Sequence, residues 1–198
     1  MAAILEPGDL GGSQRERILN GLAQSIRDRG LPATQITHIV ANARTSRSTF
    51  YKCFEDKDSC FFELVRIVTT IGLAEVENAV DSTASWRDQV QVAIGTYFDL
   101  LGVDPALTVA WSRDLAGLGP QGVAVQQEGV ERYADLMRRI SGRAVMRRAG
   151  VRQLTMAAAV MLVAGINAMV VRSIELGETD LARLAPTAVS IVTATLEP

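Results

Sequence analysis

The sequence predicts an all-α protein, and three observations support this prediction. Aromatic residues make up only 5% of the 198 residues, while Ala, Val, Leu and Ile are abundant, a mixture that favours helices over a sandwich or barrel. Apolar residues recur at helical spacing along most of the chain, and no stretch alternates in the manner of a β-strand. Glycines stand where several of these apolar patterns stop, as expected at the carboxyl ends of helices.

The amino-terminal part of the chain predicts three short helices followed by a long one. Residues 15–29 form the first, which Gly30 is expected to end. Thr34 is a candidate cap for the second helix, Ser46 for the third and Asp56 for the long fourth one. The helices predicted after the first lie over residues 35–43, 47–54, 57–81, 85–102, 105–117, 120–149, 151–177 and 179–196.

One predicted helix contains a segment apolar enough to raise the question of a membrane. Residues 154–171 carry no charge over 18 positions, which is the lower limit for a span. Because the segment contains Asn167 and many alanines, we favour a helix buried in a bundle or a dimer interface. A membrane span is the alternative.

The length of the chain indicates how many domains it forms, and its few cysteines indicate the cellular compartment. The length suits one or two domains, and we expect a flexible arm over 1–12, a helical domain over 13–56 and a second domain over 57–198. The arm has no basic region before its short apolar run, unlike a signal peptide. With only Cys53 and Cys60 in the chain, a reducing cytoplasmic compartment is expected.

The third predicted helix has the composition of a nucleic-acid reader. Phe50 and Phe54 are four residues apart and fall on one face, so they are expected to pack and hold a helix too short to be stable alone. The other face carries hydroxyls and cations, the groups that contact phosphates and base edges. Residues 10–55 hold seven cations and three carboxylates, a balance of +4 in a chain whose net charge is −2. With the preceding helix and break, this segment predicts a helix-turn-helix.

The segment GLPATQITHIVANARTSRSTFYKCFEDKDSCF resembles the amino-terminal DNA-binding domain of the TetR/AcrR family of transcriptional regulators. The residues that match the family pattern are Thr34, Ile36, Ile39, Ala43, Ser46, Thr49, Phe50, Tyr51, Phe54, Asp56, Lys57 and Asp58. The residues that depart from it are Arg44, Thr45, Ser48, Cys53 and Cys60. Arg44 replaces the usual turn glycine, so a positive φ there would cost on the order of 1 kcal/mol.

The resemblance implies which residues contact DNA. Ser46 to Thr49 would face the major groove, and Thr34, Tyr51, Lys52 and Lys57 would contact phosphates. The full set of expected DNA contacts is Thr34, Gln35, Arg44, Thr45, Ser46, Arg47, Ser48, Thr49, Tyr51, Lys52 and Lys57.

The resemblance also implies that the carboxyl-terminal domain binds a small molecule and forms a homodimer through the helices at 151–177 and 179–196. Small residues at Ala164, Gly165 and Ala168 would allow such helices to approach closely. An apolar or aromatic effector is expected. The candidate ligand contacts are Trp86, Tyr97, Phe98, Trp111, Tyr133, Met137 and Asn167.

We therefore expect a ligand-responsive regulator, a repressor released from a palindromic operator. The alternatives are a helical small-molecule-binding module with a vestigial helix-turn-helix and an enzyme. Because His38 is the only histidine, the sequence indicates no catalytic triad, metal site or cofactor. A redox switch at Cys53 and Cys60, and an anion site in the basic cluster Arg138–Arg152, stay open beside the simpler interpretations of small apolar residues and a solvated face.

Overall fold

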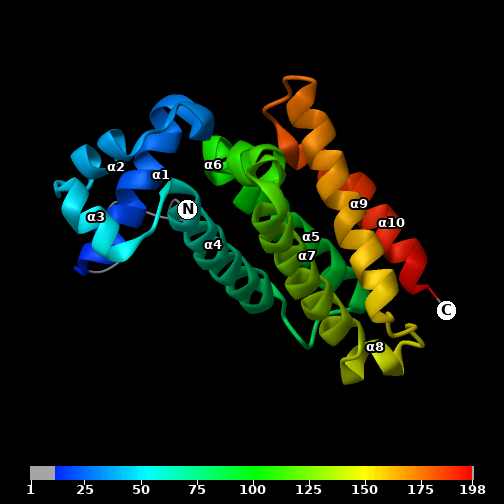
Figure 1. Ribbon diagram of the computed structural model, residues 1–198. Helices are drawn as coiled ribbons and strands as arrows, with labels where there is room; N and C mark the ends of the chain where they lie inside the picture. The colour runs from blue at the N-terminus through cyan, green and yellow to red at the C-terminus, as the bar shows by residue number, and fades with distance from the viewer. Residues whose placement is uncertain (1–11, 198) are drawn as a thin grey trace. The chain divides into compact units, whose positions relative to one another are not determined.

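The computed structural model describes residues 12–197, which are helical and contain no strand (Figure 1). The all-α prediction is therefore confirmed. The predicted flexible arm, residues 1–12, lies outside the described residues except for Gly12. The elements are α1 (Gln14–Ala33), α2 (Ile36–Asn42), α3 (Arg47–Cys53), α4 (Lys57–Ala79), α5 (Trp86–Val103), α6 (Pro105–Val109), η1 (Ala110–Asp114), η2 (Leu115–Leu118), α7 (Gly119–Ser141), α8 (Ala144–Arg148), α9 (Met156–Glu175), η3 (Leu181–Leu184) and α10 (Ala185–Leu196).

The chain divides into two compact units. The first comprises residues up to Thr69 together with Val103–Gln126, and the second comprises Thr70–Gly102 and Gln127–Pro198. The first unit therefore contains more than the predicted DNA-binding segment, 13–56. The long helices α4 and α7 each contribute to both units.

Side-chain caps set the helix ends in the first unit. Ser13 and Glu16 form a reciprocal capping box at the start of α1. Gly30 has a φ of +77° and breaks α1 where the sequence predicted its end. At the start of α4 the backbone N–H of Ser59 donates to Asp56 Oδ1 at 2.7 Å, as predicted for Asp56.

The predicted cap at Thr34 is wrong. Gln35 occupies the N-cap position of α2, and Thr34 instead ends α1. The Thr34 hydroxyl donates to the carbonyl of Gly30 at 2.8 Å and lies 3.1 Å from Ser25 Oγ, inside the core. The side chain is thus committed to the preceding turn and does not reach the helix that follows.

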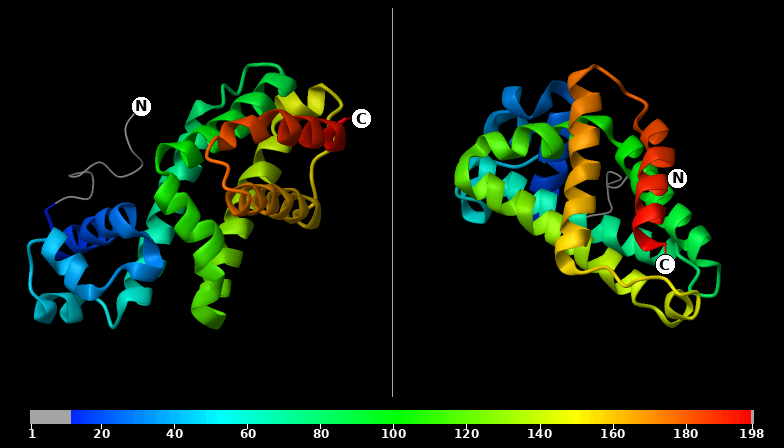
Figure 2. Two further views of the ribbon diagram at one scale, coloured as in Figure 1. Left: turned by 90° about the horizontal axis from the view of Figure 1, so that it is seen from above. Right: turned by 90° about the vertical axis from the view of Figure 1, so that its right-hand side faces the viewer.

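The first unit is held by an apolar core in which α1 and α2 approach each other closely. Ile18, Leu22, Ile39, Phe50 and Phe61 are fully buried there, and α1, α2 and α3 pack together (Figure 2). The contact between α1 and α2 is formed at Gly21. A Cβ at this position would lie 2.5 Å from the carbonyl oxygen of Ile39, so only glycine permits this spacing.

Three of the predicted helices in the carboxyl-terminal half are wrong in their extent. The helix predicted over 120–149 breaks after Ser141, because the Ser141 hydroxyl donates to Arg138 O at 2.9 Å and accepts from the backbone N–H of Leu154 at 3.1 Å. The same contact holds residues 151–155 out of a helix. Thr155 then caps α9 by accepting from the N–H of Ala158 at 3.2 Å.

The last predicted helix, 179–196, begins later than expected. Residues 181–184 form a 3₁₀ turn, and α10 starts at Ala185 with Pro186 in its first turn. Proline is tolerated in the first turn because the N–H groups there have no acceptor within the helix, so the N–H that proline lacks is not needed. The helix predicted over 105–117 is present, but its middle, Ala110–Asp114, has the wider π-helical winding.

Helix α9 is long and apolar enough to cross a membrane by length and composition alone, and one third of its most apolar window is buried in the single chain. The same length and composition occur in helices that pack against protein. The bent pair formed by Trp86–Val103 and Pro105–Ser141 passes the same test.

The contact at Gly21 generates a prediction about stability. Replacing Gly21 with Ala places a methyl group against backbone atoms of α2, which have no room to rotate away. We expect the free energy of unfolding to fall by about 1–3 kcal/mol, measured by chemical denaturation.

The matched control is Gly95→Ala, in helix α5. A Cβ at Gly95 meets nothing within 4 Å, so alanine is expected to be neutral or to stabilise by up to about 1 kcal/mol. Equal stability of the two variants would contradict the close approach of α1 and α2.

Candidate functional site

Helix α3 begins at a side-chain cap, as the sequence predicted. The backbone N–H of Thr49 donates to Ser46 Oγ at 3.1 Å. This cap satisfies one of the free N–H groups of a helix that is only seven residues long. The cap therefore fixes where α3 starts and hence which residues lie on its outer face.

Aromatic side chains anchor α3 on one side only. Phe50 is fully buried, and its ring centroid lies 5.8 Å from that of Phe54, which is also buried. Tyr51 packs edge-on against Phe50 at 5.6 Å, yet half of its surface is exposed. The exposed residues of this segment are Ser46, Arg47, Ser48, Tyr51 and Lys52, with Thr49 half-buried. α3 thus presents hydroxyls and cations without a carboxylate.

The turn before α3 contains an arginine in a conformation that usually requires glycine. Arg44 has a φ of +49° and is exposed, as its place in the turn predicted. The turn is closed by hydrogen bonds from the N–H of Arg44 to Ala41 O at 3.2 Å and from the N–H of Thr45 to Val40 O at 2.9 Å. The strained backbone places one more cation beside α3.

Three further expected DNA contacts, Gln35, Lys57 and Thr34, differ from one another in exposure and in hydrogen bonds. Gln35 is exposed at the start of α2, where its backbone N–H donates to His38 Nδ1 at 3.2 Å. Lys57 is half-buried, and its ammonium donates to the carbonyl of Leu31 at 3.1 Å. The Thr34 side chain is buried, so a phosphate would meet its backbone rather than its hydroxyl.

A further arginine, which the sequence analysis did not single out, joins α1, α3 and α4. Arg15 Nη1 donates to the carbonyl of Cys53 at 2.7 Å, and its guanidinium lies 4.3 Å from the ring centroid of Phe54. Its Nε donates to Glu63 Oε1 at 2.6 Å, and the Glu63 hydrogen bond raises the pKa of Arg15. Arg15 thus caps the end of α3 and supports its position.

The first unit also ties α1 to α6 through a buried carboxylate. Arg27 Nε donates to Asp104 Oδ2 at 2.7 Å, and Asp104 is only 6% exposed. The other carboxylate oxygen accepts from the N–H of Leu107 at 3.1 Å and caps α6. A buried charge is stable only when paired in this manner.

The second unit encloses a cavity of about 70 Å³. Its wall is formed by α4, α5, α7, α8, α9 and α10, and almost all of the lining side chains are apolar. The lining residues are Val76, Gln89, Val90, Ala93, Ile94, Tyr97, Tyr133, Leu136, Met137, Ile140, Ser141, Met146, Val163, Ile166, Val192 and Leu196.

Three of the seven expected ligand contacts line this cavity, namely Tyr97, Tyr133 and Met137. The two tyrosine rings pack edge to face with centroids 5.2 Å apart. Burial raises the pKa of both phenols, that of Tyr133 to about 12, so both are neutral at physiological pH.

The other four expected contacts lie elsewhere. Asn167 stands behind the wall, where its Oδ1 accepts from the Tyr97 hydroxyl at 3.0 Å. Trp86 and Phe98 are buried on α5 but do not line the cavity. Trp111 belongs to the first unit. Helical spacing in the sequence does not distinguish residues that line the cavity from residues buried elsewhere in the core.

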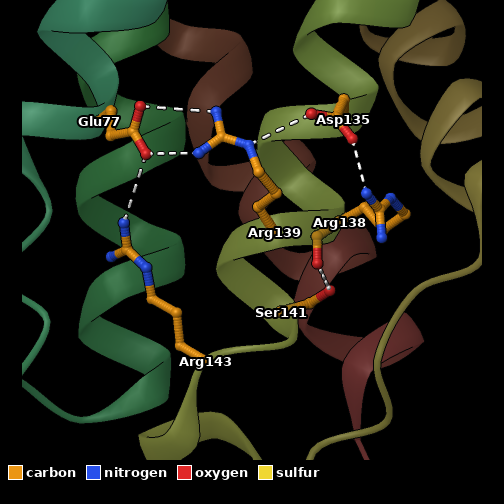
Figure 3. Close-up of polar contacts among 6 residues, drawn as sticks. All are labelled: Glu77, Asp135, Arg138, Arg139, Ser141 and Arg143. Atoms are coloured by element: carbon orange, nitrogen blue, oxygen red, sulfur yellow. Dashed lines mark hydrogen bonds and ion pairs between the residues drawn. The ribbon is translucent and has the colours of Figure 1, made fainter.

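Part of the basic cluster Arg138–Arg152 is neutralised by acids from α4 and α7 (Figure 3). Arg139 Nη1 donates to Glu77 Oε1 at 2.6 Å, and its Nε donates to Asp135 Oδ2 at 3.2 Å. Arg138 Nη2 reaches Asp135 Oδ1 at 2.8 Å, and Arg143 Nη2 lies 3.9 Å from Glu77 Oε1. Hydrogen bonding to Arg139 lowers the pKa of Glu77. These pairs join α4 to α7 at the edge of the second unit.

The two cysteines differ in their burial. Cys60 is fully buried, and this burial raises the pKa of its thiol well above its usual range, which opposes thiolate formation. Cys53 is half-buried at the end of α3. Within residues 12–197, no three His, Cys, Asp or Glu side chains are grouped so as to hold a metal ion.

The strain at Arg44 generates a second prediction. Replacing Arg44 with Gly removes the cost of a positive φ, and we expect the free energy of unfolding to rise by about 1 kcal/mol. Chemical denaturation measures the change. Arg44→Lys is the control, because lysine keeps both the charge and the strain. A rise in stability with lysine but not with glycine would contradict this explanation.

Comparison with known proteins agrees with this geometry. Residues 18–64 match the family model described as bacterial regulatory proteins, tetR family. A comparison with curated proteins found no match.

Solved structures show the same fold over nearly the whole chain. The regulator FadR from Bacillus subtilis, solved in complex with stearoyl-CoA, aligns with a TM-score of 0.75 at 16% identity, over 91% of this chain and 98% of FadR. FadR from Bacillus halodurans gives a TM-score of 0.77 at 15% identity, with 92% and 95% covered. SmeT, the repressor of the Stenotrophomonas maltophilia multidrug efflux pump SmeDEF, gives 0.71 at 22% identity, with 95% and 92% covered.

These solved proteins are described as a transcriptional regulator, a fatty acid degradation regulator and a repressor. Residues 18–64 therefore match the helix-turn-helix domain of the tetR family of bacterial regulatory proteins, and the chain shares the helical fold of solved transcriptional regulators.

Proposed function

We propose that the protein is a homodimeric transcriptional repressor that a small apolar or aromatic effector releases from a palindromic operator. The observation that carries this proposal is the outer face of α3, which is rich in hydroxyls and cations and is held by the buried Phe50. SmeT, which has the same fold, is described as a repressor. We expect such a regulator to act in the cytoplasm, where the DNA is.

DNA contact would centre on the exposed residues of α3. Arg47 lies in the first turn of α3, from where its guanidinium would contact a guanine edge or a phosphate. Tyr51 and Lys52 lie one turn later and would contact phosphates. Arg44, Thr45 and Gln35 flank α3 and would add backbone contacts. To contact a phosphate, the Lys57 ammonium would have to give up its hydrogen bond to the carbonyl of Leu31, or donate to that carbonyl and the phosphate at the same time.

Dimerisation would use the exposed faces of α9 and α10, which run in opposite directions (Figure 1). Along α9 the exposed residues between the ends are uncharged, and Met161 is 65% exposed in the single chain. Ile191 on α10 is 48% exposed. The small residues Ala164, Gly165 and Ala168 would let a second copy approach closely. A surface of this kind is a candidate interface because it leaves large apolar side chains in water.

The cavity in the second unit would hold the effector. The structure of FadR from Bacillus subtilis contains stearoyl-CoA, which supports a ligand-responsive role for proteins of this fold. The cavity here measures about 70 Å³ and is apolar, so it suits a much smaller molecule. Release from DNA requires only that the effector bind the DNA-free conformation more tightly than the DNA-bound one.

Fluorescence anisotropy tests the proposal most directly. The labelled duplex carries the DNA immediately upstream of the protein's own gene, and a scrambled duplex is the control, both over a salt series. We expect specific affinity to exceed that for the scrambled duplex by about 10³ or more, with two chains per site. Equal and weak binding that vanishes with salt would instead indicate a vestigial helix-turn-helix.

Substitutions on α3 test the contact residues. We expect Arg47→Ala, Tyr51→Ala and Lys52→Ala each to weaken operator binding by about 1–3 kcal/mol without unfolding the protein. Lys52→Ala should also reduce the salt slope by about 0.9 per protomer, because one phosphate contact is lost. The charge-matched control is Arg148→Ala, an exposed position in the second unit. Unchanged affinity in all three α3 variants would refute the assignment.

Analytical ultracentrifugation tests the dimer. Met161→Glu places a charge in the middle of the exposed apolar face of α9, so we expect the dimer to dissociate and operator affinity to fall with it. Val123→Glu is the control, because Val123 is an exposed apolar residue on α7 in the first unit. A dimer that survives Met161→Glu would exclude the centre of α9 from the interface.

A further inference from the structure

One lining residue of the cavity carries a buried polar atom that has no partner among the described residues. Gln89 is 1% exposed and lies on α5, with its side chain in the cavity wall. Its Oε1 accepts no hydrogen bond. A buried acceptor without a donor is unfavourable, so its presence in a largely apolar wall points to a ligand.

The orientation of this amide follows from its neighbours. Gln89 Nε2 donates to the carbonyl of Ala84 at 3.0 Å and lies 3.5 Å from the carbonyl of Ser82. Both partners are acceptors only, so turning the amide over would set oxygen against oxygen. The nitrogen is therefore committed to the loop before α5, and the oxygen stays unpaired.

Two other polar side chains of the wall, Tyr97 and Ser141, already have hydrogen-bond partners. The Tyr97 hydroxyl donates to Asn167. Ser141 Oγ both donates to Arg138 O and accepts from the N–H of Leu154. No charged side chain lines the cavity within the described part of the chain, so a carboxylate or phosphate inside it would be desolvated without a counter-charge.

We propose that Gln89 Oε1 is the specificity-determining acceptor of the effector site, and that the effector is a neutral, largely apolar molecule with one N–H or O–H donor. This inference deepens the proposed effector function and rests on it. The donor would pair with Oε1 while the apolar remainder packs against the aliphatic wall. At about 70 Å³, the cavity is smaller than the ~150 Å³ cavity that takes benzene. Even a monocyclic aromatic ligand would therefore require the flexible Met137 to move.

Matched probe pairs test the acceptor without knowledge of the natural effector. Indole and benzofuran have nearly the same shape, but indole presents an N–H donor where benzofuran has a ring oxygen. Phenol and fluorobenzene form a smaller pair of the same kind. Hydrophobic transfer alone favours the less polar benzofuran and fluorobenzene, so a preference for the donor members cannot arise from apolar burial.

The readout is an NMR titration of the DNA-free, full-length protein labelled with ¹³C at the methionine methyl groups. Met137 and Met146 line the cavity, while Met156 and Met161 are exposed on α9 and serve as internal controls. We expect shifts at the first two methyls and a Kd for indole about tenfold or more below that for benzofuran, with phenol likewise preferred over fluorobenzene.

The variants assign this preference to one residue. In Gln89→Met, which keeps the length of the side chain but removes the acceptor, we expect the preference to fall below about threefold. Gln91→Met is the matched control on the same helix, because Gln91 is exposed, and it should keep the wild-type preference. Since Gln89→Met also removes the bonds to the loop, its melting curve establishes that it is folded, and the wild-type probe pairs test the proposal without it.

Three results would overturn the inference: equal affinities within both pairs in the wild-type protein, an undiminished preference in folded Gln89→Met, or no shift at Met137 and Met146 with any probe. Because no DNA is present, these results are separate from a failure of operator binding. A protein that does not bind DNA can still show the donor preference, and a repressor can lack it.

Discussion

The burial of Phe50 is the contact on which the position of α3 and its outer face depends. Helix α3 has seven residues, which is too few for stability in water, so tertiary contacts must hold it. Burying one phenylalanine contributes about 1.5–3 kcal/mol, and Phe50 is fully buried against α1 and α2. Ser46 fixes the start of α3 and Arg15 caps its end at Cys53. With position and both ends set, the outer face of α3 is free to carry residues chosen for contact rather than for packing.

The chain crosses between the two units three times. The chain passes from one unit to the other within α4, at the last residue of α5, and within α7. The second of these passages joins Gln89 and Tyr97 on α5 to Asp104, which caps α6 and pairs with Arg27 on α1. The residues that directly follow α5 are therefore tied to α1 in the first unit. Asp104 is buried, and breaking its pair would leave a charge uncompensated, so α6 and α1 are expected to move together.

The sequence predicted the first unit much better than the second, and the reason is the range of the interactions involved. Gly30, Ser46 and Asp56 act on residues at most a few positions away, and each ends or begins a helix as predicted. The break after Ser141 depends on a hydrogen bond from Leu154, thirteen residues later, which no local pattern contains. Likewise, apolar spacing identified α5 as amphipathic but did not separate the wall residue Tyr97 from the core residue Phe98, because both face inward.

Gln89 illustrates the same limit and also what a structure adds to a sequence. A glutamine on a helix with a polar face is usually solvated, so nothing in the sequence distinguishes Gln89 from Gln91, two positions later. Packing places the first in an apolar wall and the second in water. Only the commitment of its amide nitrogen to two carbonyls shows that no protein donor reaches the oxygen in the described residues. An apolar side chain of the same size would avoid the cost of this buried acceptor, and a donor on a bound ligand would offset that cost.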